Sequence, residues 1–440
     1  MWPDAPERND EPFTLLDGRT ENVDLLLRSG ATRFLMSYDL MIRRQSVLAG
    51  YLARVAVHLV LDEAHGMKAG SASQRGAFLL SIATRGPSRY SNWDAVAAGF
   101  WRSRVSTGIS MAGSRARLAD STRRAPREVL ASIYVRTTKQ ELGLPPVRRH
   151  FHQVGMARGQ MALYGVVRNE ALRQLSVAIK GGAGLDFIGA RRSVMRLLQL
   201  SVNPILALNS MAGEVVGLQS GIVDEVLGEG PSEKMRAVVD HARRLAGEGY
   251  KSVIWTIFTD TISELERMLA DLNPVSLFGA VPAGEATNPD TREGRLRRFH
   301  TDAACHILIA NPAAAGEGIS LHTVCHHAIY LDRSYVSTHY LQSMDRVHRL
   351  GLPPDVETHI HLYQTKSPVG LGSIDLSVSR RLATKLRNLQ QLLNDPDLHQ
   401  VALDEEDADD PVDYDVGLQD LVDWVDELEG RAKGEDEDAG

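Results

Sequence analysis

The chain has 440 residues, of which 43% are hydrophobic and 24% charged, so it can form two or three domains with buried cores. No run approaches the roughly 18 consecutive apolar residues of a membrane span, and the polar start does not resemble a secretion signal. Only two cysteines occur, which makes a disulfide framework unexpected. We therefore expect a cytoplasmic protein without membrane contact.

The net charge of −7 is distributed unevenly along the chain. The last 40 residues carry 17 acidic and 2 basic side chains, so the first 400 carry 47 basic and 39 acidic ones. A basic body suits a protein that binds a polyanion, and an acidic tail can fold back on that body or remain in solvent. We expect residues 401–440 to be a solvated acidic tail.

In chain order, residues 1–30 are polar and lack a clear pattern, so we expect a poorly structured start. The apolar run Val55–Leu61 predicts a buried parallel strand that ends at Asp62. Apolar residues at three- and four-residue spacing then predict helices over Gln160–Ile179 and Ala190–Leu208.

Residues 228–232, rich in Gly and Glu, mark a boundary after which predicted helices and strands alternate. The helices expected there are Ser232–Gly247, Thr261–Leu272 and Arg292–His300, the strands are Ser252–Phe258, His306–Ala310 and His327–Leu331, and a loop covers 279–290. This alternation predicts a parallel sheet covered on both faces. Ligands of such sheets bind at the carboxyl ends of the strands.

The segment from Asp62 to His65 reads D-E-A-H and directly follows the first predicted strand. Two adjacent carboxylates there can divide the work of nucleotide hydrolysis, with Asp62 holding magnesium and Glu63 deprotonating the attacking water. The alternative is an acidic turn that caps a helix. The apolar run before Asp62, and Lys68 three residues after His65, argue against that alternative.

Two arginines, Arg346 and Arg349, lie in the segment Gln342–Arg349, which we predict to be helical. Three residues apart on a helix, their guanidinium groups project from one face. Such a pair can neutralise the charge that develops on a transferred phosphoryl group. The alternative is an ordinary solvated basic face.

Small residues follow the strand that ends at Ala310, in a segment that contains Gly316, Glu317 and Gly318. They allow backbone amides to approach a phosphate or a sugar closely. A lone G-x-G is weak evidence, and it gains value here from lying between a strand and the predicted arginine helix.

In combination, these segments resemble the ordered motifs of Swi/Snf-type helicase-like ATPases of superfamily two. The D-E-A-H segment with Lys68 is similar to motif II (Walker B), and Gln342–Gly351 to motif VI. Further similarities are motif V at Ala313–Leu321, motif IV at Lys251–Phe258, motif Ib at Met36–Asp39, the inter-lobe signature at Val135–Lys139 with Leu144–Pro146, and the family's ending at Asp332–Ser334, Ser373–Asp375 and the helix Arg380–Leu393. An ordered set is more specific than any single motif.

The resemblance implies an α/β fold of RecA-like parallel-sheet lobes. Its expected parts are an incomplete first lobe over 31–150, a helical inter-lobe region over 151–230 and a complete C-terminal lobe over 231–400. ATP and Mg are the implied cofactors, with Glu63 as the base, Asp62 as the magnesium partner, and Arg346 and Arg349 as arginine fingers. The residues implied to contact the nucleotide are Asp62, His65, Gly316, Glu317, Gly318, Gln342 and Asp345. Double-stranded DNA is the implied partner, and the residues expected to face it are Ser37, Tyr38, Thr107 and Gly108.

The sequence departs from the family pattern in two places. No G-x-x-x-x-G-K-[ST] phosphate-binding loop (Walker A) occurs in the 440 residues, so we expect a separately encoded N-terminal motor half to supply it. Thr107 and Gly108 are followed by Ile109 and Ser110 in place of the usual T-P, which makes motif III degenerate. Two interpretations therefore remain: part of a DNA translocase, or a catalytically inactive remnant that binds nucleic acid or protein.

Two Cys-His segments, Cys305–His306 and Cys325–His327, could be drawn together as a zinc site. Their spacing matches no common zinc pattern, and both lie beside predicted strands, where a cysteine is usually a small buried hydrophobe. We predict no metal at these cysteines.

Overall fold

The computed structural model describes ten segments of the chain, and the chain forms two compact units, residues 1–136 and 137–440. The described residues are 13–16, 23–55, 57–59, 89–90, 139–180, 187–211, 220–315, 319–366, 373–393 and 396–404. Among the described helices, none is long and apolar enough to cross a membrane.

In the first unit, the described strands form two short parallel pairs. The pairs are β1 (Thr14–Leu16) with β2 (Phe34–Met36) and β3 (His58–Leu59) with β4 (Arg89–Tyr90), and the helices are α1 (Val23–Leu27), α2 (Tyr38–Arg43) and α3 (Gln45–Leu52). The predicted strand at Val55 begins later than expected, since the Val55 N–H donates to the Tyr51 carbonyl and continues the end of α3. Its last residues lie outside the described segments.

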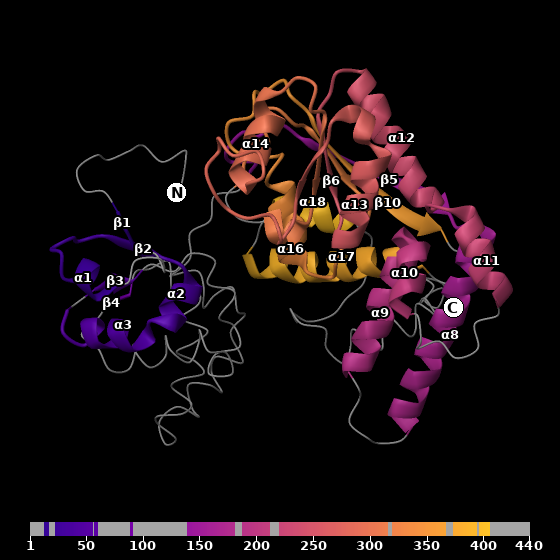
Figure 1. The fold of residues 1–440 in the computed structure, drawn as a ribbon, viewed down its shortest axis with the longest axis horizontal. Helices are drawn as coiled ribbons and strands as arrows, with labels where there is room; N and C mark the ends of the chain where they lie inside the picture. The colour runs from indigo at the N-terminus through magenta and orange to yellow at the C-terminus, as the bar shows by residue number, and fades with distance from the viewer. Residues whose placement is uncertain are drawn as a thin grey trace, which may run out of the picture. The chain divides into compact units, whose positions relative to one another are not determined.

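In the second unit, six parallel strands form one sheet in the order β5-β10-β9-β6-β8-β7. Figure 1 labels β5, β6 and β10 of this sheet. The strands are β5 (Val147–Gly155), β6 (Ser252–Trp255), β7 (Val275–Leu277), β8 (Ile307–Ala310), β9 (His327–Tyr330) and β10 (Thr358–Lys366). The register confirms the parallel pairing expected from the sequence, with Trp255 beside Ala310 on one side and Tyr330 on the other.

Helices cover both faces of this sheet, as expected for parallel strands whose residues are buried on both sides. The described helices of this unit are α8 (Arg158–Lys180), α9 (Phe187–Val202), α10 (Pro204–Met211), α11 (Ser220–Glu229), α12 (Glu233–Gly247), α13 (Thr259–Met268), α14 (Arg292–Thr301), α15 (Pro312–Ala315), α16 (Ser337–Met344), α17 (Ile374–Leu393) and α18 (Pro396–Asp404). Ile254 of β6 belongs to the core with α12 and α13, while Val253 and Trp255 belong to the core with α9, α16 and α17. The α/β class with a parallel-sheet lobe predicted from the sequence is therefore confirmed.

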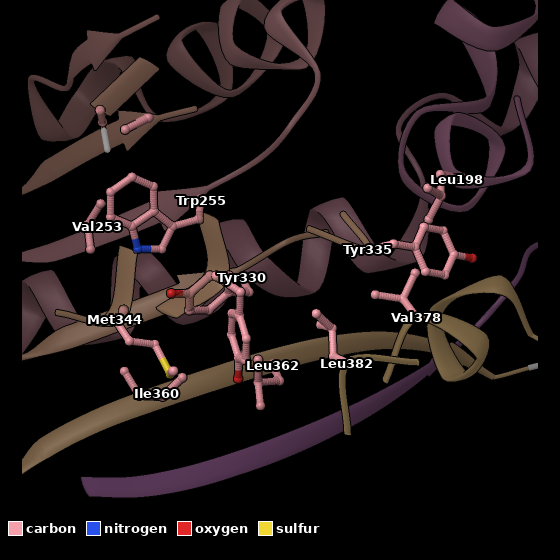
Figure 2. Packing of buried hydrophobic residues seen from close by; sticks show 14 of the residues in the cluster. Leu198, Val253, Trp255, Tyr330, Tyr335, Met344, Ile360, Leu362, Val378 and Leu382 are labelled. Atoms are coloured by element: carbon pink, nitrogen blue, oxygen red, sulfur yellow. The ribbon is translucent and has the colours of Figure 1, made fainter. Parts of the chain in front are cut away.

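The larger of the two cores is built around aromatic side chains of the central strands. Trp255 and Tyr330 stack with ring centroids 6.4 Å apart, and the Tyr330 hydroxyl hydrogen-bonds to the Ser343 hydroxyl at 2.7 Å. Figure 2 shows Leu198 of α9 close to Tyr335, which precedes α16, and to Val378 of α17. This core therefore joins α9 and α17 to the sheet.

The predicted helix Ala190–Leu208 consists of two helices, α9 and α10. Pro204 has no N–H with which to continue α9, and the Asn203 side chain instead accepts a hydrogen bond from the Leu206 N–H at 3.2 Å. The predicted helix Ser232–Gly247 is confirmed as α12, whose first turn is capped by the Ser232 hydroxyl.

The structure places the boundary between its two units at Arg136 and Thr137, earlier than the expected division at residue 150. Residue 150 falls inside β5, which pairs along its full length with β10. The helices of the expected inter-lobe region, 151–230, belong to the same unit as the sheet, because α8 and α9 pack into its core.

Candidate nucleotide site

One buried carboxylate, Asp332, connects the carboxyl ends of the central strands. It lies two residues after the end of β9. Asp332 accepts hydrogen bonds from the Thr256 hydroxyl at 2.5 Å and from the Ile257 N–H at 2.7 Å. The Asn311 side chain, after β8, donates to the Ile257 carbonyl at 2.9 Å. These contacts fix the strand ends where ligands of parallel α/β sheets bind.

Burial raises the pKa of the Asp332 carboxyl to about 6, although its hydrogen bonds to Thr256 and Ile257 act in the opposite direction. A buried carboxylate whose oxygens already accept two close hydrogen bonds is not available to a ligand. We therefore assign Asp332 a structural role, in which it fixes the end of β9 to the residues that follow β6.

Arg346 lies beside the residues that follow Gly318 in the chain. Its guanidinium donates to the Ile319 carbonyl at 3.1 Å, and its own carbonyl accepts from the Leu321 N–H at 2.9 Å. Two hydrogen bonds in opposite directions thus join the start of the predicted motif VI arginine pair to the end of the predicted motif V segment. This brings together parts of two motifs that lie about 25 residues apart in the sequence.

The segment with the two arginines is helical only in its first part. Helix α16 ends at Met344, and residues 345–351 form successive turns, so Arg346 and Arg349 do not share a helix face as predicted. Gly351 closes these turns with φ +104°, a conformation that L side chains rarely adopt. A Cβ there would lie 3.0 Å from Nε2 of the His322 imidazole, so any other residue would also crowd that ring.

Asp345 is held by a lysine of the predicted inter-lobe signature. Lys139 Nζ donates to Asp345 Oδ1 at 2.5 Å and to the His348 carbonyl at 3.3 Å, and the Lys139 N–H donates to Asp397 at 2.6 Å. His348 Nε2 lies 2.7 Å from the Pro145 carbonyl, to which it can donate. The contacts give Asp345 a structural role in bracing the turns that carry the arginines.

Sequence reasoning left Lys139 and His348 without roles, although both stand in segments that resemble family motifs. Burial lowers the pKa of His348, and the positive charge of Lys139 lowers it further, so the imidazole is neutral near pH 7. Conventional motif reading could not find this network, because its partners are 206 and 209 residues apart in the sequence.

The other predicted site residues fall into two groups. Gln342 lies half-buried in α16, and Ser37 is the N-cap of α2, where its hydroxyl accepts from the Leu40 N–H at 3.3 Å. Tyr38 is the first residue of that helix. Asp62, Glu63, His65, Thr107, Gly108, Gly316, Glu317 and Gly318 lie outside the described residues. Their assigned roles stay predictions.

Both cysteines are buried in the second unit. The Cys325 thiol lies 3.4 Å from the His327 carbonyl, and burial raises its pKa to about 12. Burial also raises the pKa of Cys305. Both groups are therefore protonated thiols near pH 7.

Residues 233–351 match the helicase conserved C-terminal domain. The chain is also similar to Helicase SWR1 of Cryptococcus neoformans var. neoformans serotype D (strain B-3501A), with 25% identity over 182 residues. That alignment covers 41% of this chain and 14% of the relative. Helicase SWR1 of Eremothecium gossypii is 28% identical over 131 residues, which are 30% of this chain and 8% of the relative.

Two solved structures show a weaker likeness. The C-terminal part of the Fun30 ATPase domain is 19% identical, with a TM-score of 0.41 over 65% of this chain and 99% of that one. The Sulfolobus solfataricus SWI2/SNF2 ATPase C-terminal domain is 18% identical, with a TM-score of 0.37 over 55% and 86%.

The parallel sheet and the matched domain define the second unit as a helicase-like C-terminal lobe. The matched domain and the SWR1 relatives agree with the resemblance to Swi/Snf-type helicase-like ATPases that the order of the motifs had indicated. The chain spans only a small part of those relatives' length.

Proposed function

We propose that the chain is part of a Swi/Snf-type motor that uses ATP and Mg to move along double-stranded DNA in the cytoplasm. The observation that carries the proposal is the hydrogen-bonded joint between Arg346 and the segment 319–321, within a matched helicase C-terminal domain. In this role the second lobe presents Arg346 and Arg349 to the nucleotide. The DNA is held mainly through its phosphates, with little dependence on sequence.

The arginines fit a nucleotide because a fixed guanidinium can neutralise phosphoryl charge without reorganising. The Ile319 carbonyl orients Arg346, and the turn closed by Gly351 positions the backbone around Arg349. On the first lobe, Asp62 would hold Mg through ATP and Glu63 would orient the attacking water, with His65 beside them. Gly316, Glu317, Gly318 and Gln342 would line the nucleotide site from the second lobe.

These 440 residues contain no phosphate-binding loop motif, and in the proposed motor a further N-terminal half supplies that loop. The chain alone should then hydrolyse no ATP, and addition of the N-terminal motor half should produce DNA-stimulated hydrolysis. In that mixture, Arg349→Ala should lower kcat by about a thousandfold. Arg267→Ala removes an exposed arginine of α13 and serves as the control that keeps full activity.

Steady-state ATP hydrolysis with and without double-stranded DNA tests these statements. Turnover by the chain alone, abolished by Glu63→Gln, would contradict the need for a second polypeptide. Equal turnover by the Arg349→Ala and Arg267→Ala variants of the mixture would contradict the finger role of Arg349.

A second candidate function is a catalytically inactive remnant that binds nucleic acid or protein. The missing loop motif and the residues Ile109 and Ser110 after Thr107-Gly108 favour it. Such a remnant would bind DNA with a strong dependence on salt but would give no ATP turnover with any N-terminal half.

A further inference from the structure

Two neighbouring strands of the second unit each carry a His-x-His sequence. On β5 these residues are His150 and His152, and on β10 they are His359 and His361. Because side chains alternate along a strand, both histidines of each strand project from the same face of the sheet. The register places His150 beside His361, so the two pairs meet on one face.

A helix adds a further imidazole above these strands. His241 of α12, a helix that packs on this face, has its ring centroid 4.3 Å from that of His361 and 5.6 Å from that of His152. One possible ligand nitrogen from each of these three histidines lies within 4.8 Å of the other two. His241 and His361 are buried, while His152 is half-buried at the edge strand and gives access from solvent.

The distances suit a small cation with nitrogen ligands. His152 Nε2 and His361 Nδ1 lie 3.3 Å apart. Two imidazole nitrogens that share a tetrahedral ion at about 2.0–2.1 Å are separated by about 3.4 Å. The widest separation allowed by the 4.8 Å limit exceeds this value by about 1.4 Å, which a rotation of the His241 ring can remove.

Neighbouring groups hold the second nitrogen of two of these rings. His241 Nδ1 lies 2.9 Å from the Tyr363 hydroxyl, which leaves Nε2 as the nitrogen for an ion. His361 Nε2 lies 3.5 Å from His327 Nδ1, so its Nδ1 faces His152. Outer contacts of this kind fix the tautomer and orientation of histidine ligands in metal sites.

We propose that His152, His241 and His361 bind one divalent transition-metal ion such as zinc, which joins β5, β10 and α12. Imidazole nitrogen favours zinc, nickel, copper or cobalt over magnesium and calcium, which prefer oxygen. The site is separate from the proposed motor function and would stabilise the edge strand β5, which begins at Val147, eight residues after Lys139.

Burial of the three histidines favours metal binding, while a nearby positive charge weakens it. Burial lowers the pKa of His241 to about 4, and it lowers the pKa of His152 too, so both rings are neutral ligands near pH 7. The positive charge of Arg244, on the same helix, contributes to both shifts and opposes a bound cation. We therefore expect a moderate affinity for the metal ion. The acidic group nearby is Asp240, whose negative charge acts on Tyr363.

The test uses the full chain without a polyhistidine tag, stripped of metal with a chelator and titrated with zinc in a calorimeter. One ion should bind per chain, and saturating zinc should raise Tm by about 5 °C. Cobalt in place of zinc should give the visible absorption of a four-coordinate ion, with water as the fourth ligand. Excess magnesium should not compete.

Variants connect the binding to these residues. His152→Asn changes a half-buried side chain and should abolish binding, and Tyr363→Phe should raise Kd about tenfold. His399→Asn, on α18 and exposed, is the matched control and should bind zinc like the unchanged chain. If the unchanged chain binds no zinc, or if the folded His152→Asn variant binds it equally well, the imidazoles form only a hydrogen-bonded cluster and the proposal is wrong.

Discussion

At the scale of single residues, the second unit contains a fully buried ion pair. Lys234 Nζ lies 2.8 Å from Asp375 Oδ2, and the side chains are only 1% and 5% exposed. The same carboxylate accepts from the Thr365 N–H at 2.7 Å, and the Ser201 hydroxyl lies 3.4 Å from Lys234 Nζ. The pair joins the first turns of α12 and α17 to the end of β10, at a desolvation cost that its hydrogen bonds offset.

Substitution of Lys234 alone should destabilise the fold more than neutralisation of both Lys234 and Asp375. We expect Lys234→Met to lower the free energy of unfolding by about 3–5 kcal/mol, because it leaves Asp375 charged and buried. Lys234→Met with Asp375→Asn should recover part of that loss, since Asn still accepts from the Thr365 N–H. Urea denaturation of the three proteins measures both values. A double variant that is less stable than the single one would contradict this explanation.

For the two arginines, the structure tests the predicted geometry, while their role at a phosphate stays a prediction. The spacing of Arg346 and Arg349 indicated a phosphate-facing pair, and the structure places Arg346 beside the segment after Gly318. The prediction that the two arginines share one helix face was wrong, because hydrogen bonds between Arg346 and residues 319–321 replace the next turn of α16. Tertiary partners of this kind are not visible in a local pattern.

At the scale of elements, the strands and helices predicted correctly have a clear apolar pattern. Helix α12 has a strongly amphipathic sequence and a serine cap, and β6, β8 and β9 are short buried runs. Strands β5 and β10 were missed because histidines occupy the positions where apolar residues are expected, and β7 has only three residues. The His-x-His repeats were the available signal, since alternation brings both rings to one face.

The histidine face should make stability depend on pH. Burial is the main cause that lowers the pKa of His241 and His327 to about 4 and of His361 to about 2, with the neighbouring histidines and, for His241, Arg244 adding to it. The unfolded chain, with histidine near 6.5, then binds more protons than the fold between about pH 4 and 6.5. Stability is therefore present above pH 6.5 and is lost as the pH falls.

Between pH 7 and pH 5 the free energy of unfolding should decrease by at most about 2 kcal/mol for each of these histidines. Asp332 acts in the opposite direction, because its folded pKa of about 6 exceeds the ordinary value and the fold takes up its proton first. Asp332→Asn should thus steepen the loss, whereas His327→Asn should reduce it. Urea denaturation at several pH values in metal-free buffer measures these slopes, and a stability independent of pH would contradict them.

At the scale of the whole molecule, the second unit has the contacts of an independent domain. Its start is anchored to its end, because Arg149 pairs with Asp404 at 2.6 Å and Lys139 bonds to Asp397. Strand β5 also pairs with β10 along nine residues. A division at residue 150, as the sequence suggested, would separate these partners, since the decisive contacts join residues more than 200 positions apart.

A chain that begins at residue 137 should therefore melt cooperatively, at the same temperature as the second unit of the full chain. A chain that begins at residue 157 lacks β5, so the edge of β10 is unpaired and the buried histidines of β10 are exposed. This chain should melt at a lower temperature and should associate. Calorimetry and light scattering in metal-free buffer measure the two outcomes. If both shortened chains melt alike, β5 contributes nothing to the domain, and the boundary expected from the sequence would be adequate after all.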